Sequence, residues 1–231
     1  MNVEHALKST YLYPFRAVQS GLRRQVARFA AAIKGGTLVD VGCGSRPYES
    51  LFDVDRYIGI DLIVSGRPFE WKKADIWFDG ARLPFRSASV DHVLCTGAFE
   101  HTTDPYGYMG EIVRIMRPRG NLILSVPQSE PTFEVPYDRY RFTIHGLRDL
   151  CQAHGLTLAG AYPSVGYWQS LAYHLNTMVA LSLLPRSKVL AMLLSAGTSV
   201  VTQSLAWVLD IFTKYDRDVN AWVIHAVKRE R

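Results

Sequence analysis

The sequence predicts an α/β protein built on a doubly wound, mostly parallel seven-stranded sheet, with a helical insertion before the last strand. Short apolar segments with the composition of buried strands alternate with segments of helical periodicity over much of the chain. A long stretch without strand character then precedes the final apolar segment. Alternation at this spacing is typical of parallel sheets covered by helices on both faces.

The first predicted element is an amphipathic helix within residues 14–34. Apolar residues recur there at every third or fourth position, and arginines occupy the remaining faces. Gly35 and Gly36 follow and end the helix. The apolar positions are Phe15, Val18, Leu22, Val26, Phe29 and Ile33.

Seven later segments are predicted to be strands. They are Thr37–Val41, Tyr57–Asp61, Asp75–Phe78, Val90–Cys95, Asn121–Val126, Leu156–Ala161 and Ala221–Val227. The clearest helical segments are Leu147–Ala153, Trp168–Leu184 and Lys188–Phe212. A chain of 231 residues is long enough for one sizeable core, so we expect a single domain over 1–231. Its core lies at 37–161, its helical insertion at 166–215 and its closing strand at 220–229.

Composition excludes several classes of protein. A chain that is 48% hydrophobic and 20% charged is neither disordered nor of low complexity. Its three cysteines lie far apart with no C-x-x-C pair, which predicts no disulfide framework and no metal site, and favours a reducing cytoplasm. The first residues lack the apolar run of a secretory signal. Despite the net charge of +5, no basic run with interleaved aromatic residues indicates binding to nucleic acid.

The segment from Leu38 to Gly44 places a strand directly before a glycine turn, where the backbone can approach a ligand closely. An acid, Asp61, ends the next strand, in a position to bind both hydroxyls of a ribose. Together these features predict a nucleoside cofactor. A dinucleotide such as NAD is the alternative, but its fingerprint needs a third glycine where this chain has Pro47.

Further motifs follow in order along the chain. They are Asp79–Phe85 (Asp-Gly-Ala-Arg-Leu-Pro-Phe), Ser89–Val93, Phe99–His101 with Asp104–Pro105, and Met116–Asn121. With the glycine turn and Asp61, these motifs resemble the class I S-adenosylmethionine-dependent methyltransferases, most closely the methyltransferase type 11 group, over about Thr37 to Gly155. The resemblance implies a Rossmann-like methyltransferase fold and S-adenosyl-L-methionine as cofactor. Arg46 and Arg119 stand where the family usually has glycine.

The resemblance also implies roles for single residues. Asp40, Gly42 and Gly44 are expected at the methionine part of the cofactor, with Asp40 beside its ammonium group. Asp61 is expected at the ribose, and Asp79 with the backbone of Gly80 at the adenine. Thr96 and Gly97 lie where the family's backbone contacts the cofactor.

Two groups of residues are candidates for the reaction itself. His101 follows the fourth strand at the carboxyl end of the sheet, where open α/β sheets bind ligands, so it is the candidate general base. A hydrogen bond to a loop is the alternative role for this histidine. An Arg/Tyr-rich tract after the fifth strand resembles one that borders the acceptor pocket in type 11 relatives, and a plain surface loop is its alternative. Its candidate substrate-binding residues are Tyr137, Arg139, Tyr140, Arg141 and His145.

The region after the core is almost free of charge. Only Arg186 and Lys188 are charged among the 60 residues from Leu150 to Leu209, although charged residues make up 20% of the chain. The many hydroxyl and amide side chains of residues 189–209 make a poor membrane-spanning helix. For residues 166–212 we therefore keep three interpretations: a membrane-surface contact, a lid over the acceptor, and a homodimer interface.

The sequence thus predicts an enzyme that transfers a methyl group from S-adenosylmethionine to a small-molecule acceptor of apolar or lipid-linked kind. We expect it in the cytoplasm, with peripheral association with a membrane as one interpretation of the insertion. A binding or scaffold protein that kept the fold and lost catalysis is the alternative, because Arg46 and Arg119 replace glycines.

Overall fold

The structure is a computed structural model that describes residues 16–63, 72–80, 82–132, 134–183, 188–213 and 218–230. The chain divides into two compact units. We call Gln25–Gln128, Thr132–Tyr162 and Trp222–Arg231 the sheet unit, and Met1–Arg24, Ser129–Pro131 and Pro163–Ala221 the hairpin unit. The helix α2 (Arg16–Ala30) contributes its first part to the hairpin unit and its second part to the sheet unit.

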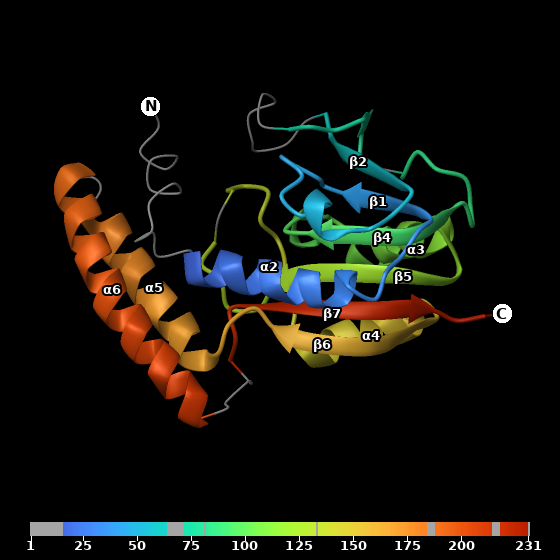
Figure 1. Ribbon diagram of the computed structural model, residues 1–231. Helices are drawn as coiled ribbons and strands as arrows, with labels where there is room; N and C mark the ends of the chain where they lie inside the picture. Colours follow the sequence, from blue (N-terminus) through green and yellow to red (C-terminus); the bar gives the residue numbers. More distant parts are fainter. Residues whose placement is uncertain are drawn as a thin grey trace. The chain divides into compact units, whose positions relative to one another are not determined.

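The sheet has seven strands in the order β3-β2-β1-β4-β5-β7-β6. Their bounds are β1 Thr37–Val41, β2 Arg56–Leu62, β3 Ile76–Phe78, β4 Val90–Thr96, β5 Met116–Pro127, β6 Leu156–Pro163 and β7 Ala221–Lys228. The strands from β3 to β5 pair in parallel, whereas the arrow of β7 points opposite to that of β1 (Figure 1). The predicted fold class, a doubly wound and mostly parallel seven-stranded sheet, is confirmed.

Strand register brings the functional motifs to one edge of the sheet. Val41 at the end of β1 pairs with Ile60 of β2 on one side and with Cys95 of β4 on the other. The chain runs outward from β1 in both directions, so the space beyond the ends of β1 and β4 is a topological switch point. Ligands bind at such points in open α/β sheets.

Helices cover both faces of the sheet. Figure 1 shows the second part of α2 in front of the strands, with α3 (Pro105–Ile115) and α4 (Ile144–Ala153) behind them. Each rear helix begins at a side-chain cap: Asp104 accepts a hydrogen bond from Gly107 N (2.9 Å) and Thr143 from Gly146 N (3.2 Å). The capping role of Thr143 follows directly from its position before the helix.

The core consists of the central strands and the helix faces packed on them. Residues of β1, β4 and β5 are apolar in near-continuous runs, because a parallel strand is buried on both faces. Among the fully buried side chains are Val39, Val41, Ile60, Leu94, Ile112, Leu122 and Leu124.

One predicted boundary is wrong: β5 begins at Met116, five residues before the expected start at Asn121. Met116 pairs with Val90 and Asn121 with His92, so residues 117–120 bulge out between two paired positions. Part of the Met116–Asn121 motif is therefore a bulge within the strand.

The hairpin unit contains two long helices, α5 (Tyr167–Leu183) and α6 (Lys188–Thr213). Asp210 near the end of α6 accepts hydrogen bonds from Trp168 N (2.9 Å) and Gln169 N (3.1 Å), so it caps the first turn of α5. Val18 of α2 packs with Val165 and Tyr173 at the base of the hairpin. Within the described residues, no helix combines the length and apolar character needed to cross a membrane.

Candidate cofactor-binding site

The glycine turn after β1 packs tightly at Gly42 and has open space at Gly44. Gly42 (φ +75°) approaches Ala98 so closely that an added Cβ would lie 2.4 Å from the Ala98 Cβ. Gly44 (φ +49°) has no atom within 4 Å of such a Cβ. The turn thus has no room for a side chain at Gly42 and leaves open space beside Gly44.

Asp40 is a buried carboxyl group with one unused oxygen. It is 1% exposed, its Oδ2 accepts a hydrogen bond from the Tyr57 hydroxyl (2.6 Å), and its Oδ1 has no hydrogen-bond partner among the described residues. Burial raises the pKa of Asp40 to about 7, against the opposing effects of the Tyr57 hydrogen bond and the Arg46 charge. A buried oxygen of this kind suits a cationic donor from a ligand.

Asp61 near the end of β2 is held in place by hydrogen bonds from three sides. Its Oδ2 accepts from Gly44 N (2.9 Å), and its Oδ1 accepts from Leu62 N (2.7 Å) and from the ammonium of Lys72 (2.7 Å). The side chains of Lys72 and Asp61 are 4% and 9% exposed. The carboxylate is therefore fixed beside the glycine turn, and nothing in the sequence motifs indicated Lys72 as its partner.

Arg46 replaces the third glycine of the family pattern yet keeps the backbone conformation that glycine would adopt. Its φ is +58°, and Arg119, at the other unusual position, has φ +62°. A residue with a side chain adopts this conformation at a cost of about 1 kcal/mol. The Arg46 guanidinium forms an ion pair with Asp75 and passes over Gly59, where any side chain would collide with it. Both arginines therefore have a positive φ, the conformation that glycine adopts most readily.

Asp79 and Gly80 follow β3, the edge strand next to β2. Asp79 is exposed, and Gly80 (φ +90°) lies so close to Leu62 that an added Cβ would be 3.0 Å from its Cδ2. The end of β3 pairs with the end of β2, where Leu62 faces Phe78. The structure therefore places the predicted ribose and adenine residues on neighbouring strand ends.

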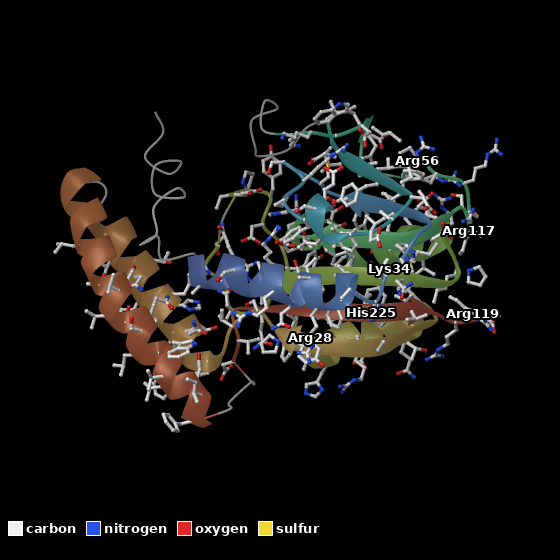
Figure 2. All side chains as sticks on the ribbon, in the orientation of Figure 1. Arg28, Lys34, Arg56, Arg117, Arg119 and His225 are labelled. Carbon is white, nitrogen blue, oxygen red and sulfur yellow. The ribbon has the colours of Figure 1, made fainter. Side chains whose placement is uncertain are left out.

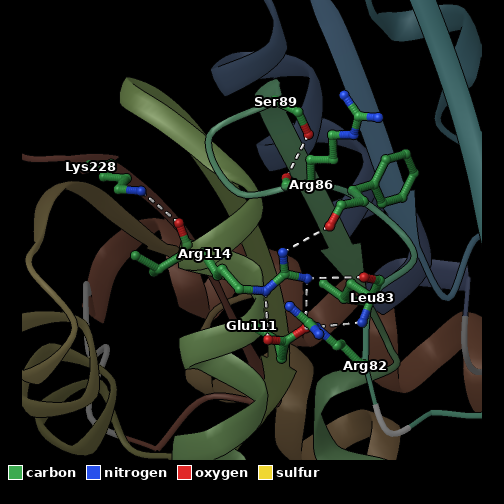
Figure 3. Close-up of polar contacts among 9 residues, drawn as sticks. Arg82, Leu83, Arg86, Ser89, Glu111, Arg114 and Lys228 are labelled. Carbon is green, nitrogen blue, oxygen red and sulfur yellow. Dashed lines mark hydrogen bonds and ion pairs between the residues drawn. The ribbon is translucent and has the colours of Figure 1, made fainter.

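The Leu-Pro-Phe motif after Gly80 is fixed by an arginine of α3 (Figure 3). Arg114 donates to the carbonyl oxygens of Leu83 (3.0 Å) and Phe85 (2.8 Å), and its guanidinium pairs with Glu111 at 2.7 and 2.8 Å. Glu111 in turn accepts from Leu83 N (3.1 Å). The hydrogen bond from Arg114 lowers the pKa of Glu111, so this latch consists of a charged pair at neutral pH. We call Glu111 and Arg114 the loop latch.

Thr96, Gly97 and His101 lie beyond β4, the neighbour of β1. Thr96 is the last residue of β4, Gly97 has φ +60°, and His101 ends the short helix η3 (Phe99–His101). The His101 Nδ1 lies 3.2 Å from the carbonyl oxygen of Tyr137, and its Nε2 lies 3.7 Å from Glu134 Oε2. Since a carbonyl oxygen only accepts, the contact requires a proton on Nδ1, so in the neutral ring Nε2 is the nitrogen that carries the lone pair.

The Arg/Tyr-rich tract does not gather its side chains into one cluster. Arg141 forms a two-pronged ion pair with Asp138 (2.6 Å for both bonds), and the Tyr140 hydroxyl donates to Thr103 O (3.3 Å). Tyr137 and Arg139 are exposed, as is His145 in the first turn of α4. Of the five predicted substrate-binding residues, Tyr137 is the one that contacts His101, through its carbonyl group.

Two surface hollows lie away from Asp40 and Asp61. One, of about 520 Å³, lies beside the loop latch along residues 82–87. The other, of about 330 Å³, lies at the amino ends of β1, β4 and β5 and includes three cations labelled in Figure 2, Lys34, Arg117 and Arg119. These cations pair with Asp53, Asp91 and Glu230 at 2.9, 2.5 and 2.5 Å. The three cations of the second hollow are therefore already paired with carboxylates.

Part of the chain is similar to a known domain family. Residues 39–124 match the family model of a methyltransferase domain. An uncharacterised chloroplastic methyltransferase of Arabidopsis thaliana is 27% identical over 161 residues, which are 58% of this chain and 46% of that protein. The chain thus spans less than half the length of this relative.

Solved structures agree on the fold. A Haloferax volcanii protein described as a methyltransferase, in complex with the activator Trm112, has a TM-score of 0.59 at 19% identity and covers 99% of this chain and 98% of its own. The 1,6-didemethyltoxoflavin-N1-methyltransferase of Burkholderia thailandensis, with S-adenosylhomocysteine bound, has a TM-score of 0.52 at 16% identity, over 90% of this chain and 78% of its own. The fold is that of the predicted methyltransferases, and residues 39–124 match a methyltransferase domain.

Proposed function

We propose that this protein is an enzyme that transfers the methyl group of S-adenosyl-L-methionine to a small-molecule acceptor. The observation that carries the proposal is the arrangement at the switch point: a buried Asp40 with an unpartnered oxygen, an open glycine turn, and Asp61 fixed beside that turn. The family match over residues 39–124 supports it. The cofactor is S-adenosyl-L-methionine.

Residues of the sheet unit hold the cofactor at both ends. Asp40 Oδ1 binds its ammonium group, with Gly42 and Gly44 lining the methionine part. Asp61 accepts the ribose hydroxyls after its contact with Lys72 is exchanged for them. The adenine lies against Asp79 and the Gly80 backbone, while Thr96 and Gly97 border the cofactor at the end of β4.

The sulfonium cofactor supplies an activated methyl group, which moves to the acceptor in line as the bond to sulfur breaks and the electron pair stays on sulfur. The chain's part is alignment and exclusion of water. For a hydroxyl or ammonium acceptor, His101 takes the proton on Nε2, since the Tyr137 carbonyl keeps Nδ1 protonated. Glu134, 3.7 Å from Nε2, stabilises the imidazolium that forms.

The acceptor in this proposal is apolar or lipid-linked. The charge-poor segment 166–215 supports this choice, because its exposed side chains suit contact with an apolar molecule, a membrane or a second copy of the chain. The reaction takes place inside the cell, in keeping with three cysteines that are all buried and unpaired.

Calorimetric titration with S-adenosylhomocysteine tests the cofactor assignment. We expect the wild type to bind and Asp61→Ala to bind about 10- to 100-fold more weakly, because charged hydrogen bonds to the ribose are lost. The matched control is Lys72→Met, which frees the same carboxylate and is expected to bind at least as tightly as the wild type. No binding by the wild type, or equal binding by Asp61→Ala, contradicts the proposal.

A further inference from the structure

The hairpin of α5 and α6 has its polarity reversed relative to helices of soluble proteins. Large apolar side chains point away from it, with Phe212 79%, Val201 68% and Met178 61% exposed. Figure 2 shows carbon side chains extending outward from α6. The other exposed large apolar residues of the two helices are Leu171, Leu175, Leu194, Val200, Leu205, Trp207, Val208 and Ile211.

The buried positions of the same helices are small or polar. Asn176 is fully buried in α5 and exchanges hydrogen bonds with Thr202 of α6 (3.0 and 3.3 Å). The remaining buried positions described in the hairpin are Ser170, Ala172, Tyr173, Thr177, Ser199 and Ala206. Small residues between two helices, with an interhelical hydrogen bond such as that of Asn176 and Thr202, are typical of helix packing in lipid.

A water-exposed helix pair has the opposite arrangement, with large apolar residues between the helices and charges outside. Here the sequence of α6 contains only two charged residues, Lys188 at its first position and Asp210. Asp210 is occupied in capping α5. A protein interface usually has a polar rim around its apolar centre, whereas the described exposed residues of α6 form a broad apolar face without a charged border.

The charge that α2 brings to the hairpin unit is positive, whereas Glu130 of the same unit accepts a hydrogen bond from the Tyr173 hydroxyl (3.1 Å). The α2 segment of the hairpin unit is attached at the hairpin base, where Val18 and Leu22 pack with Tyr173. Arg23 and Arg24 are exposed on this segment, and α2 contains no acidic residue. Such residues attract anionic lipid head groups near an apolar surface.

We propose that the α5–α6 hairpin inserts its outward apolar faces into one leaflet of a lipid bilayer without crossing it. Leaflet insertion agrees with the lack of a membrane-spanning helix among the described residues. This partner goes beyond the proposed methyl transfer and needs no cofactor, so its test is independent of that function.

Flotation of the full chain with phosphatidylcholine and phosphatidylglycerol vesicles, without cofactor, tests the proposal. We expect the wild type to float with the vesicles. The double variant Val201→Asp, Leu205→Asp should bind at least about tenfold more weakly, because two side chains one turn apart lose their favourable burial. Tyr106→Asp is the matched control, since Tyr106 is 59% exposed and Leu205 58%, but Tyr106 lies in the sheet unit. The helix content measured by circular dichroism shows whether the double variant still folds.

Other outcomes overturn the proposal. If the wild type stays in the soluble fraction, lipid does not cover this face. Sedimentation equilibrium then distinguishes a monomer from a dimer that the double variant dissociates. Equal flotation of wild type and double variant shows that another surface binds the vesicles. Cofactor binding without flotation leaves the methyl-transfer proposal intact.

Discussion

Asp40 is a buried carboxyl group whose protonation depends on pH and, in the proposed function, on the bound cofactor. Burial raises its pKa from 3.8 to about 7, so between these values the folded chain holds a proton that the unfolded chain releases. The residue therefore stabilises the fold least when ionised, above about pH 7. An ammonium group at its Oδ1 favours the ionised form, so binding of the cofactor and loss of this proton are coupled.

We predict that affinity for S-adenosylmethionine rises as the pH increases from about 6 to 7, by up to about tenfold per pH unit. In Asp40→Asn this rise is lost, because an amide does not titrate in this range. Calorimetry in buffers of different ionisation enthalpy checks both statements, since wild-type binding should release a proton. An unchanged pH profile in Asp40→Asn would place the ammonium group elsewhere.

Sequence reasoning proposed candidate site residues that belong to motifs and gave no sign of the residues that contact them in the folded chain. Asp40 and Asp61 were predicted because each ends a strand next to a turn of recognisable pattern. Lys72 and Glu134 were missed because no motif contains them. Lys72 contacts Asp61, 11 residues earlier, and Glu134 contacts His101, 33 residues earlier. The pairing of Arg141 with Asp138 was also missed, although the two lie three residues apart in the same tract.

At the scale of elements, strand identity was easier to predict than strand boundaries. Parallel strands bury both faces and leave apolar runs that are plain in the sequence, as in β1, whose observed bounds equal the predicted ones. The start of β5 was missed because Met116 pairs with Val90 across a bulge, which depends on the partner strand. The loop latch was not predicted either, since it joins a motif to a helix about 30 residues away.

We predict that the loop latch stabilises the segment that follows the adenine residues. Arg114→Ala removes hydrogen bonds to two carbonyl groups and leaves Glu111 without its main partner, so the free energy of unfolding should fall by about 2–3 kcal/mol. The control is Arg82→Ala: Arg82 lies 4.0 Å from the same Glu111 with 74% of its side chain exposed. Its loss should cost about 0.5 kcal/mol or less. Urea unfolding followed by circular dichroism distinguishes the two, and equal effects would show that the latch does not stabilise the loop.

At the scale of the whole molecule, the two proposed roles, cofactor binding and contact with an apolar partner, fall in different units of the chain. The sheet unit contains every residue proposed to bind the cofactor, from Asp40 to Gly97, whereas the exposed apolar helices belong to the hairpin unit. The uneven distribution of charge along the sequence reflects this division. It left open whether residues 166–212 cover the acceptor, bind a membrane or join two copies.

Hydrogen exchange on the intact chain can separate these roles, because a ligand slows exchange in the backbone that it orders. We predict that S-adenosylhomocysteine slows amide exchange at the ends of β1, β2 and β4 and leaves α5 and α6 unchanged. Lipid vesicles should slow exchange in α5 and α6 and leave those strand ends unchanged. If the cofactor product alone slowed exchange in the hairpin, the helices would close over the cofactor, and the lid interpretation would replace the division of roles. The two effects are additive only if the units act independently, so the combined experiment with both ligands measures their coupling.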